Sequence, residues 1–213
     1  MKLAVKYKEV IIINDGSTDR TAHELSKLKS NKVDFKVIHH KFNQGKGAAV
    51  KTGIKRAKGN YIIIQDADLE YDPDDIKKLI KLVSSGESQI VYGTRLNRMP
   101  DFSKDERTIQ FLIHYMGNKV LSLMTSVFYG NWLTDMECCY KLFPKKALKD
   151  ITLHAKGFEL EPEITAKLLK KGHKIKEVAI STNPRSYAEG KKLNTLRDGT
   201  KAIWTLVKYR FID

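Results

Sequence analysis

The chain has 213 residues, of which 41% are hydrophobic and 30% are charged, and this composition is typical of one folded, soluble domain rather than a disordered segment. Its 39 Lys and Arg residues against 25 Asp and Glu residues give a net charge of +14, which favours phosphate-rich partners such as nucleotides or an anionic membrane surface. The two cysteines, Cys138 and Cys139, are adjacent, which argues against both a disulfide framework and a metal site.

Neither a secretory signal nor a membrane-spanning segment is expected from the sequence. Residues 1–8 are short and carry lysines without an apolar stretch. The most apolar segment, Ile109–Leu133, is interrupted by polar residues. It predicts one or two amphipathic helices that lie on the fold or on a bilayer.

Predicted strands and helices alternate along the first half of the chain. The strands are expected at Glu9–Ile13, Phe35–Ile38, Tyr61–Gln65 and Gln89–Tyr92, and the helices between them at Thr21–Leu28, Gly45–Ala57 and Pro73–Ser84. Further along, we expect a helix at Leu160–Lys171, a strand at Lys176–Ser181 and a basic tail and helix over residues 182–213. This order predicts a single α/β domain over residues 1–213, with a mostly parallel sheet flanked by helices.

Two carboxylates that follow the third predicted strand are the most informative feature of the chain. Asp66 and Asp68 come directly after the run Tyr61–Gln65, and Glu70 adds a third carboxylate. Ligands of open α/β sheets bind outside the carboxyl ends of the strands, and carboxylate oxygens suit Mg²⁺ or Mn²⁺. The pattern predicts a divalent-metal site, with a polar loop before the helix at Pro73 as the alternative.

Polar clusters also follow the first two predicted strands. Asp15 follows the first strand, where a carboxylate can accept hydrogen bonds from a base or a ribose, or where its cluster simply caps the next helix. The segment Asn43–Ala49 opens a helix with Gly45 and Gly47, which allow a phosphate to approach the backbone N–H groups and the helix dipole. Three strand ends therefore carry clusters of the kind that bind nucleotides.

The same glycines partly imitate a dinucleotide-binding fingerprint, because Asp66 follows Gly45 by about twenty residues. However, Val50 stands where the third glycine belongs, and the loop 39–44 is long for the tight turn that this motif needs. A doubled carboxylate also suits a metal better than a ribose hydroxyl. A dehydrogenase is therefore the weaker interpretation.

Seven motifs occur in series: Ile13–Asp19, Asn43–Ala49, Asp66–Tyr71, Tyr92–Arg95, Thr134–Glu137, Phe158–Thr165 and Arg185–Lys192. In this series the chain resembles the family 2 glycosyltransferases of GT-A fold, in the branch of dolichyl- and polyprenyl-phosphate sugar synthases. The resemblance extends from about Glu9 to the C-terminus. It is specific because the motifs occur together and in this order.

The resemblance implies an inverting transfer of mannose or glucose from GDP-mannose or UDP-glucose to a dolichyl or polyprenyl phosphate, with Mg²⁺ or Mn²⁺ as the cofactor. Each implied role has its own residues: Asp15, Gly45, Lys46 and Asp66 for the nucleotide sugar, Asp66, Asp68 and Glu70 for the metal, Asp68, Arg95 and Arg107 for catalysis, and Arg185, Tyr187 and Lys191 for the acceptor phosphate.

The chemistry agrees with this assignment, because an acceptor phosphate is already anionic near neutral pH and needs little help from a general base. The reaction needs a metal and cations that stabilise the leaving diphosphate. Asp135 and Glu137 lie where other family members place a catalytic base, and we expect them to be positioning or structural groups first. The charge and the amphipathic stretch predict peripheral contact with an anionic membrane, at its cytoplasmic, inner face.

The chain departs from the family at its N-terminus. Family members normally begin with one more strand and helix, which carry a Pro-x-Tyr-Asn-Glu motif, whereas residues 1–8 lead straight into the strand that matches the family's second. The neighbouring strands are expected to lose ladder partners. The alternatives are a non-catalytic or truncated remnant, a glycosyltransferase with another acceptor, and a nucleic-acid-binding protein. Nucleic acid is disfavoured because no recognised motif accompanies the charge.

Overall fold

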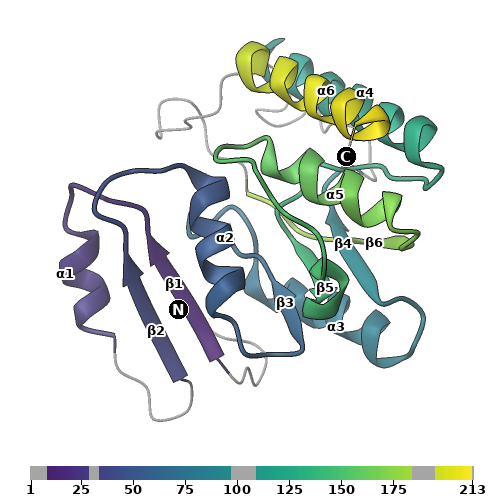
Figure 1. Cartoon of the computed structure of the whole chain (residues 1–213). Helices are drawn as coiled ribbons and strands as arrows, with labels where there is room; N and C mark the ends of the chain where they lie inside the picture. Colours follow the sequence, from purple (N-terminus) through teal and green to yellow (C-terminus); the bar gives the residue numbers. More distant parts are fainter. Residues whose placement is uncertain (1–8, 29–33, 97–108, 184–194, 213) are drawn as a thin grey trace.

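The computed structural model describes residues 9–28, 34–96, 109–183 and 195–212, which form strands and helices in alternation (Figure 1). In chain order the elements are β1 (Glu9–Asn14), α1 (Thr21–Ser26), β2 (Asp34–His39), α2 (Lys46–Arg56), β3 (Tyr61–Ile63), η1 (Pro73–Asp75), α3 (Ile76–Ser84), β4 (Ile90–Thr94), α4 (Ile109–Tyr129), β5 (Lys141–Pro144), η3 (Lys145–Leu148), α5 (Leu160–Lys170), β6 (Ile175–Ala179) and α6 (Thr195–Phe211).

The predicted elements are confirmed, with small differences at their ends. The amphipathic stretch from Ile109 forms one long helix, α4, and the basic tail contains the helix α6. The predicted helix at Pro73 begins as a single turn of 3₁₀-helix, in which the Asp72 carboxylate accepts a hydrogen bond from the backbone N–H of Asp74 at 2.9 Å. Strand β5 was not predicted, because its four residues include a lysine and a proline and carry no clear strand pattern.

Five of the six described strands point the same way, as the predicted mostly parallel sheet requires. β1 pairs with β2 in parallel, and β4 pairs with β6 in parallel. β5 is the exception, since it lies between β3 and β4 and runs antiparallel to both. Contacts at both ends indicate that β1 and β3 share a direction. At their starts, Glu9 of β1 accepts a hydrogen bond of 2.8 Å from the backbone N–H of Gly59, which lies just before β3. The residues that follow these two strands both reach the N-terminus of α2.

The described strands form two sheets rather than one. The order is β1-β2 in the first sheet and β3-β5-β4-β6 in the second, so within the described residues β1 pairs only with β2 and β3 only with β5. Helix α2 packs against β1, where Gly53 approaches the side chain of Ile13, and it contributes Val50 and Ile54 to the core beside the second sheet.

Helix α5 is the centre of the fold. Its residues from Leu160 to Leu169 are all buried, because α5 lies between the larger sheet and the pair α4 and α6 (Figure 1). A hydrogen bond of 3.2 Å between the hydroxyls of Tyr92 and Thr165 joins the helix to β4. A helix that is buried all round must pair every charge that it carries.

Glu163 on α5 is a buried carboxylate that joins three segments of the chain. Its oxygens accept hydrogen bonds from the backbone N–H groups of His154 and Ala155, at 2.8 and 2.7 Å. They also accept from Lys167 Nζ and from the hydroxyl of Tyr209 on α6, each at 2.8 Å. Burial alone would raise the pKa of Glu163, but these donors outweigh it and hold the pKa below its usual value.

We expect Glu163→Gln to lower the free energy of unfolding by about 3 kcal/mol at neutral pH, because it leaves the Lys167 ammonium buried without its counter-charge. The pKa of Glu163 is depressed in the folded state, so this stabilisation is present above the unfolded pKa of about 4.5 and is lost as the pH falls below it. Urea unfolding at several pH values measures the difference between the two proteins.

The matched control is Glu87→Gln, which removes a carboxylate from a solvent-exposed pair with Lys176. It should change the stability by less than about 1 kcal/mol. Equal losses in the two variants, or a gap that persists unchanged at pH 3, would contradict the role given to Glu163.

Candidate active site

Asp66 and Asp68 lie where the sequence analysis placed them, just after β3 leaves the sheet. The turn that follows is tight. Leu69 has a φ of 63°, and Asp68 Oδ1 accepts a hydrogen bond of 3.1 Å from the backbone N–H of Glu70. A leucine with positive φ carries a strain that the surrounding structure must support. The two carboxylates therefore stand on a constrained turn at the carboxyl end of β3.

Asp15 is held by the loop that leads into α2. Its oxygens accept hydrogen bonds from the backbone N–H groups of Gln44 and Gly45, at 3.0 and 2.8 Å, and one of them lies 2.6 Å from His40 Nδ1. Burial opposes ionisation of Asp15, but the contacts with His40, Gln44 and Gly45 outweigh it and hold the pKa below its usual value. Asp15 thus fixes the start of α2, and its predicted contact with a nucleoside stays a prediction.

Gly45 and Gly47 allow another segment of backbone to approach the N-terminus of α2. Gly45 has a φ of 95°, and a Cβ atom there would lie 2.4 Å from the carbonyl oxygen of Lys156. A Cβ atom at Gly47 would lie 2.7 Å from the carbonyl oxygen of Ala155. A close approach of the backbone at Ala155 and Lys156 therefore requires glycine at both positions. The predicted approach of a phosphate to the start of α2 stays a prediction.

Lys46 connects the predicted metal site to the interior. Its Nζ lies 2.8 Å from Asp66 Oδ2 and 2.9 Å from Glu161 Oε1. Burial alone would lower the pKa of Lys46, but the nearby carboxylates outweigh it and hold the pKa well above its usual range. In the same way, Lys46 outweighs the effect of burial on Asp66 and lowers the pKa of that carboxyl. Both groups are therefore charged at neutral pH.

The line of charges continues into the core through Lys141, a fully buried lysine on β5. Its Nζ lies 2.6 Å from Glu161 Oε2, donates to the carbonyl oxygens of Met136 and Cys138, and sits 4.7 Å from the centre of the Tyr92 ring. Glu161 is 2% exposed, and neither oxygen makes a hydrogen bond of good geometry, so its ionic contacts with Lys46 and Lys141 compensate its charge.

Glu161 entered the sequence prediction only as part of the motif Phe158–Thr165, and Lys141 was not predicted to have a role. The sequence does contain one indication of a buried charge, which is a lysine between the apolar residues of Tyr140–Phe143. A lysine that is buried with such neighbours needs a partner of opposite charge. The identity of that partner depends on the packing of α5 against β5.

Arg95, predicted to act on phosphate charge, has a partner within the protein. Its Nε and Nη2 donate to the two oxygens of Asp135 at 2.7 Å each, and its backbone N–H donates to the same carboxylate at 2.8 Å. Burial opposes the charged form of Asp135, but Arg95 outweighs it and lowers the pKa. The segment is held in turn by Glu177 on β6, which accepts from the backbone N–H groups of Thr134 and Asp135. Asp135 is thus a positioning group, and phosphate contact by Arg95 stays a prediction.

Glu137 differs from Asp66 and Asp135, whose pKa values are lowered. Burial, followed by the nearby Glu161 carboxylate, raises its pKa to about 7. Its Oε1 atom is buried and has no hydrogen-bond partner within the part of the chain that the structure describes. Glu137 can therefore exchange a proton near neutral pH.

The carboxylates fit a metal only as an incomplete ligand set. In the described ranges of the chain, no three His, Cys, Asp or Glu side chains come together closely enough to hold an ion, so Asp66, Asp68 and Glu70 do not form a preassembled triad. Hard oxygen ligands of this type suit Mg²⁺ or Mn²⁺, which commonly take their remaining ligands from water and substrate phosphates. The donor set is consistent with an ion that binds together with a diphosphate.

The other predicted site residues, Arg107, Arg185, Tyr187 and Lys191, lie outside the described residues. The structure does describe Thr182 and Asn183, which come shortly before Arg185 in the chain. Thr182 forms a bridge with Tyr71, and the backbone N–H of Asn183 donates to the carbonyl oxygen of Glu70 at 2.8 Å. The segment before Arg185 is thus anchored beside the turn that carries Asp68.

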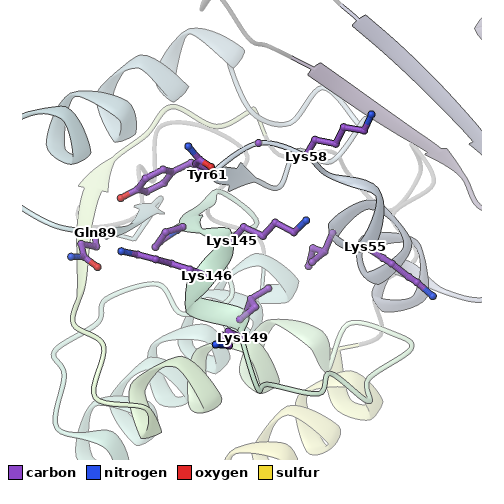
Figure 2. A pocket seen from close by; sticks show the side chains of 12 residues that line it. Lys55, Lys58, Tyr61, Gln89, Lys145, Lys146 and Lys149 are labelled. Carbon is purple, nitrogen blue, oxygen red and sulfur yellow. The ribbon is translucent and has the colours of Figure 1, made fainter.

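The protein also has a basic hollow of about 750 Å³, but it lies away from these carboxylates (Figure 2). It is lined by the C-terminal end of α2, the start of β3 and the segment after β5, at the opposite end of β3 from Asp66. Its lysines are Lys55, Lys58, Lys145, Lys146 and Lys149. In Figure 2 their ammonium groups point in different directions, which does not favour one bound anion.

Comparison with known proteins agrees with the strand-end motifs. The family model of glycosyl transferase family 2 matches residues 3–152. The chain belongs to glycosyltransferase family 2. It is 30% identical over 207 residues to a UDP-N-acetylglucosamine–dolichyl-phosphate N-acetylglucosaminyltransferase of Methanococcus voltae, covering 89% of this chain and 80% of that protein. It is 29% identical over 192 residues to a dolichyl-phosphate beta-glucosyltransferase of Trichomonas vaginalis, covering 87% of this chain but only 56% of that protein.

The solved structures identify the fold of this glycosyltransferase as GT-A. One of them is glucosyl-3-phosphoglycerate synthase from Mycobacterium tuberculosis in complex with Mn²⁺, uridine diphosphate and glucosyl-3-phosphoglycerate. The two chains superpose with a TM-score of 0.66 at 16% identity, over 96% of this chain and 70% of the other. The predicted fold class is confirmed.

We expect Lys46→Met to increase the affinity of the nucleotide-free protein for Mn²⁺ by about tenfold, or roughly 1.4 kcal/mol, because the Lys46 ammonium competes with the metal ion for Asp66. Binding is measured by electron paramagnetic resonance of free Mn²⁺. Lys55→Met, a change of an exposed lysine on the same helix, is the control and should leave the affinity unchanged. An equal or weaker affinity in Lys46→Met would show that Lys46 does not compete with the ion.

Proposed function

We propose that this glycosyltransferase moves a hexose, mannose or glucose, from a nucleotide sugar such as GDP-mannose or UDP-glucose to a dolichyl or polyprenyl phosphate, with inversion. The observation that carries the proposal is the position of Asp66 and Asp68 at the carboxyl end of β3, beside Lys46 at the start of α2. The two relatives named above, a dolichyl-phosphate beta-glucosyltransferase and a dolichyl-phosphate N-acetylglucosaminyltransferase, support the choice of acceptor.

In this proposal, an oxygen of the acceptor phosphate attacks the anomeric carbon, the bond from that carbon to the diphosphate breaks, and the nucleoside diphosphate leaves with the electron pair. Asp66 and Asp68 would hold a divalent ion, which would supply positive charge to the leaving diphosphate. Lys46 adds a charged ammonium at the same place, since its pKa keeps it protonated. Asp15 keeps the loop before α2 in position for the nucleotide.

The acceptor phosphate is proposed to bind through Arg185, Tyr187 and Lys191. The anchoring of Asn183 beside Glu70 supports this, because it starts the segment at the edge of the donor site. A planar guanidinium suits two phosphate oxygens better than an ammonium does. Arg95 and Arg107 are proposed to act on phosphate charge near the transferring sugar.

We propose peripheral attachment at the cytoplasmic, inner face of the membrane, where a lipid phosphate is accessible. The net charge of +14 supports contact with anionic lipids. Within the described residues, no helix combines the length and the hydrophobicity needed to cross a bilayer.

The direct test is metal-dependent release of nucleoside diphosphate from GDP-mannose, UDP-glucose and UDP-N-acetylglucosamine, each with and without a polyprenyl phosphate. We expect release only with the acceptor, with one donor preferred, and loss in EDTA. Asp68→Asn should reduce transfer by at least about 100-fold while the protein stays folded, because one ligand of a weakly held ion is lost. Asp74→Asn, a change of an exposed carboxylate paired with Lys77, is the control.

Full transfer in EDTA, or an Asp68→Asn variant as active as Asp74→Asn, would contradict the metal-dependent mechanism. The absence of release with every donor, from a protein that unfolds cooperatively, would favour the non-catalytic alternative.

A second test separates the acceptor side from the donor side. We expect Arg185→Ala to lower transfer to polyprenyl phosphate by about 100-fold, as for the loss of one charge-stabilising donor, and to leave the affinity for the nucleotide sugar within about twofold. Lys191→Ala should show a smaller effect of the same kind. Lys149→Ala, in the distant basic hollow, controls for net charge. If Arg185→Ala weakens nucleotide binding and transfer equally, Arg185 belongs to the donor side.

A further inference from the structure

Helix α4 is apolar on its outer side. Among the α4 side chains that the structure describes, the exposed ones are all apolar, and they recur at intervals of four and three residues along one stripe: Ile109, Ile113, Met116, Val120, Leu123 and Val127. A helix on the surface of a water-soluble protein normally shows the reverse, with polar residues outward. An apolar stripe of this length marks an interaction surface.

The polar side of α4 faces inward and fixes the rotation of the helix. Ser122 and Ser126 are buried. Ser122 Oγ accepts a hydrogen bond of 2.9 Å from the backbone N–H of Met136, and Ser126 Oγ accepts one of 3.0 Å from that of Leu133. Rotating the stripe inward would break both bonds and leave buried N–H groups without partners. The stripe is therefore held facing outward.

Helix α6 packs against α4 (Figure 1) and also carries exposed apolar side chains. Trp204 on α6 is 65% exposed, and Trp132, just after α4, is 74% exposed. These are the two tryptophans of the whole chain. Lys201 and Arg210 are exposed on α6 as well. We call the α4 stripe together with Trp132, Trp204 and these two basic side chains the α4–α6 face.

The charges of the α4–α6 face decide what can cover it. Neither helix range contains an exposed acidic side chain among the described residues: α4 has no Asp or Glu, and Asp198 on α6 is buried. A second copy of the chain, docked by the same face, would bring basic side chains against basic side chains. An anionic bilayer offers hydrocarbon to the stripe, an interface to the tryptophans and negative charge to Lys201 and Arg210.

We propose that the α4–α6 face is the surface by which this glycosyltransferase docks on an anionic lipid bilayer. The inference rests on the proposed function only in that a lipid acceptor requires such contact. The face also adjoins the site, because the segment after Trp132 leads directly to Asp135, the partner of Arg95. A docked molecule therefore brings this part of the site close to the lipid phosphates.

The experiment uses the whole chain and vesicles of phosphatidylcholine with or without phosphatidylglycerol. Both tryptophans report on this face, so we expect their emission to shift to shorter wavelength with anionic vesicles and to be quenched by lipids brominated in the acyl chains. The variants Trp132→Phe and Trp204→Phe assign the signal to each end of the face. An unshifted and unquenched emission in the presence of bound vesicles would overturn the proposal.

Two sets of substitutions test the contact itself by vesicle sedimentation. The triple variant Ile113→Ser, Val120→Ser, Val127→Ser should bind at least tenfold more weakly, and Lys201→Gln with Arg210→Gln about fivefold more weakly. The matched control is Lys145→Gln with Lys146→Gln and Lys149→Gln, which removes more charge from the basic hollow on another surface and should change binding less than twofold. Thermal unfolding checks that each variant is folded. If the triple variant does not fold, the quenching of the unmodified chain by brominated lipids tests the docking surface instead.

Three results would overturn the proposal. The stripe variant could bind like the unmodified chain, or the control could weaken binding as much as the α6 pair, which would indicate diffuse electrostatic attraction. The stripe variant could instead turn a dimer into a monomer in analytical ultracentrifugation, which would assign the face to a second copy.

Transfer to a short, water-soluble polyprenyl phosphate without vesicles should be unchanged in the stripe variant. If the unmodified chain docks as proposed but transfers no sugar, the proposed function fails and the docking surface stands.

Discussion

The candidate site depends on a line of four alternating charges, Asp66, Lys46, Glu161 and Lys141, which runs from the turn after β3 into the core. Glu161 and Lys141 are almost completely buried, and burial of either one alone would cost several kcal/mol. Each is tolerated only because its neighbours compensate it. The position of α5 relative to β5 therefore determines where Lys46 lies, and Lys46 determines the resting position of Asp66.

A second constraint is the division of the described strands into two sheets. A two-stranded sheet such as β1-β2 is marginal by itself, so its position relative to β3 depends on packing and on side-chain contacts. Glu9 ties the start of β1 to the backbone before β3, and α2 ties the other ends together through Asp15 and Lys46. Asp15 and Asp66, the two carboxylates proposed for the donor site, thus both contact the N-terminus of α2. A small movement of that helix changes the separation of Asp15 and Asp66.

Much of this arrangement is local and could be predicted from the sequence. Runs such as Val10–Ile13 indicate strands, and glycines and acids after them indicate the edge of the sheet where a ligand binds. The partners of Lys141, Arg95 and Asp15 could not be predicted, because each lies on another element and is set by long-range packing. The antiparallel β5 was missed for a local reason, because its four residues include a lysine and a proline. The sequence also could not distinguish glycines that admit a phosphate from glycines that admit the backbone at Lys156.

Helix α4 joins the proposed membrane surface to the site by one set of hydrogen bonds. Its apolar residues recur around much of the helix, so sequence periodicity alone does not say which side faces out. The buried Ser122 and Ser126 decide it, because they hold the backbone of residues 133–136. That segment carries Asp135, which orients Arg95 through two hydrogen bonds. The hydrogen bonds that turn the apolar stripe of α4 outward therefore also hold the segment that positions the Arg95 guanidinium.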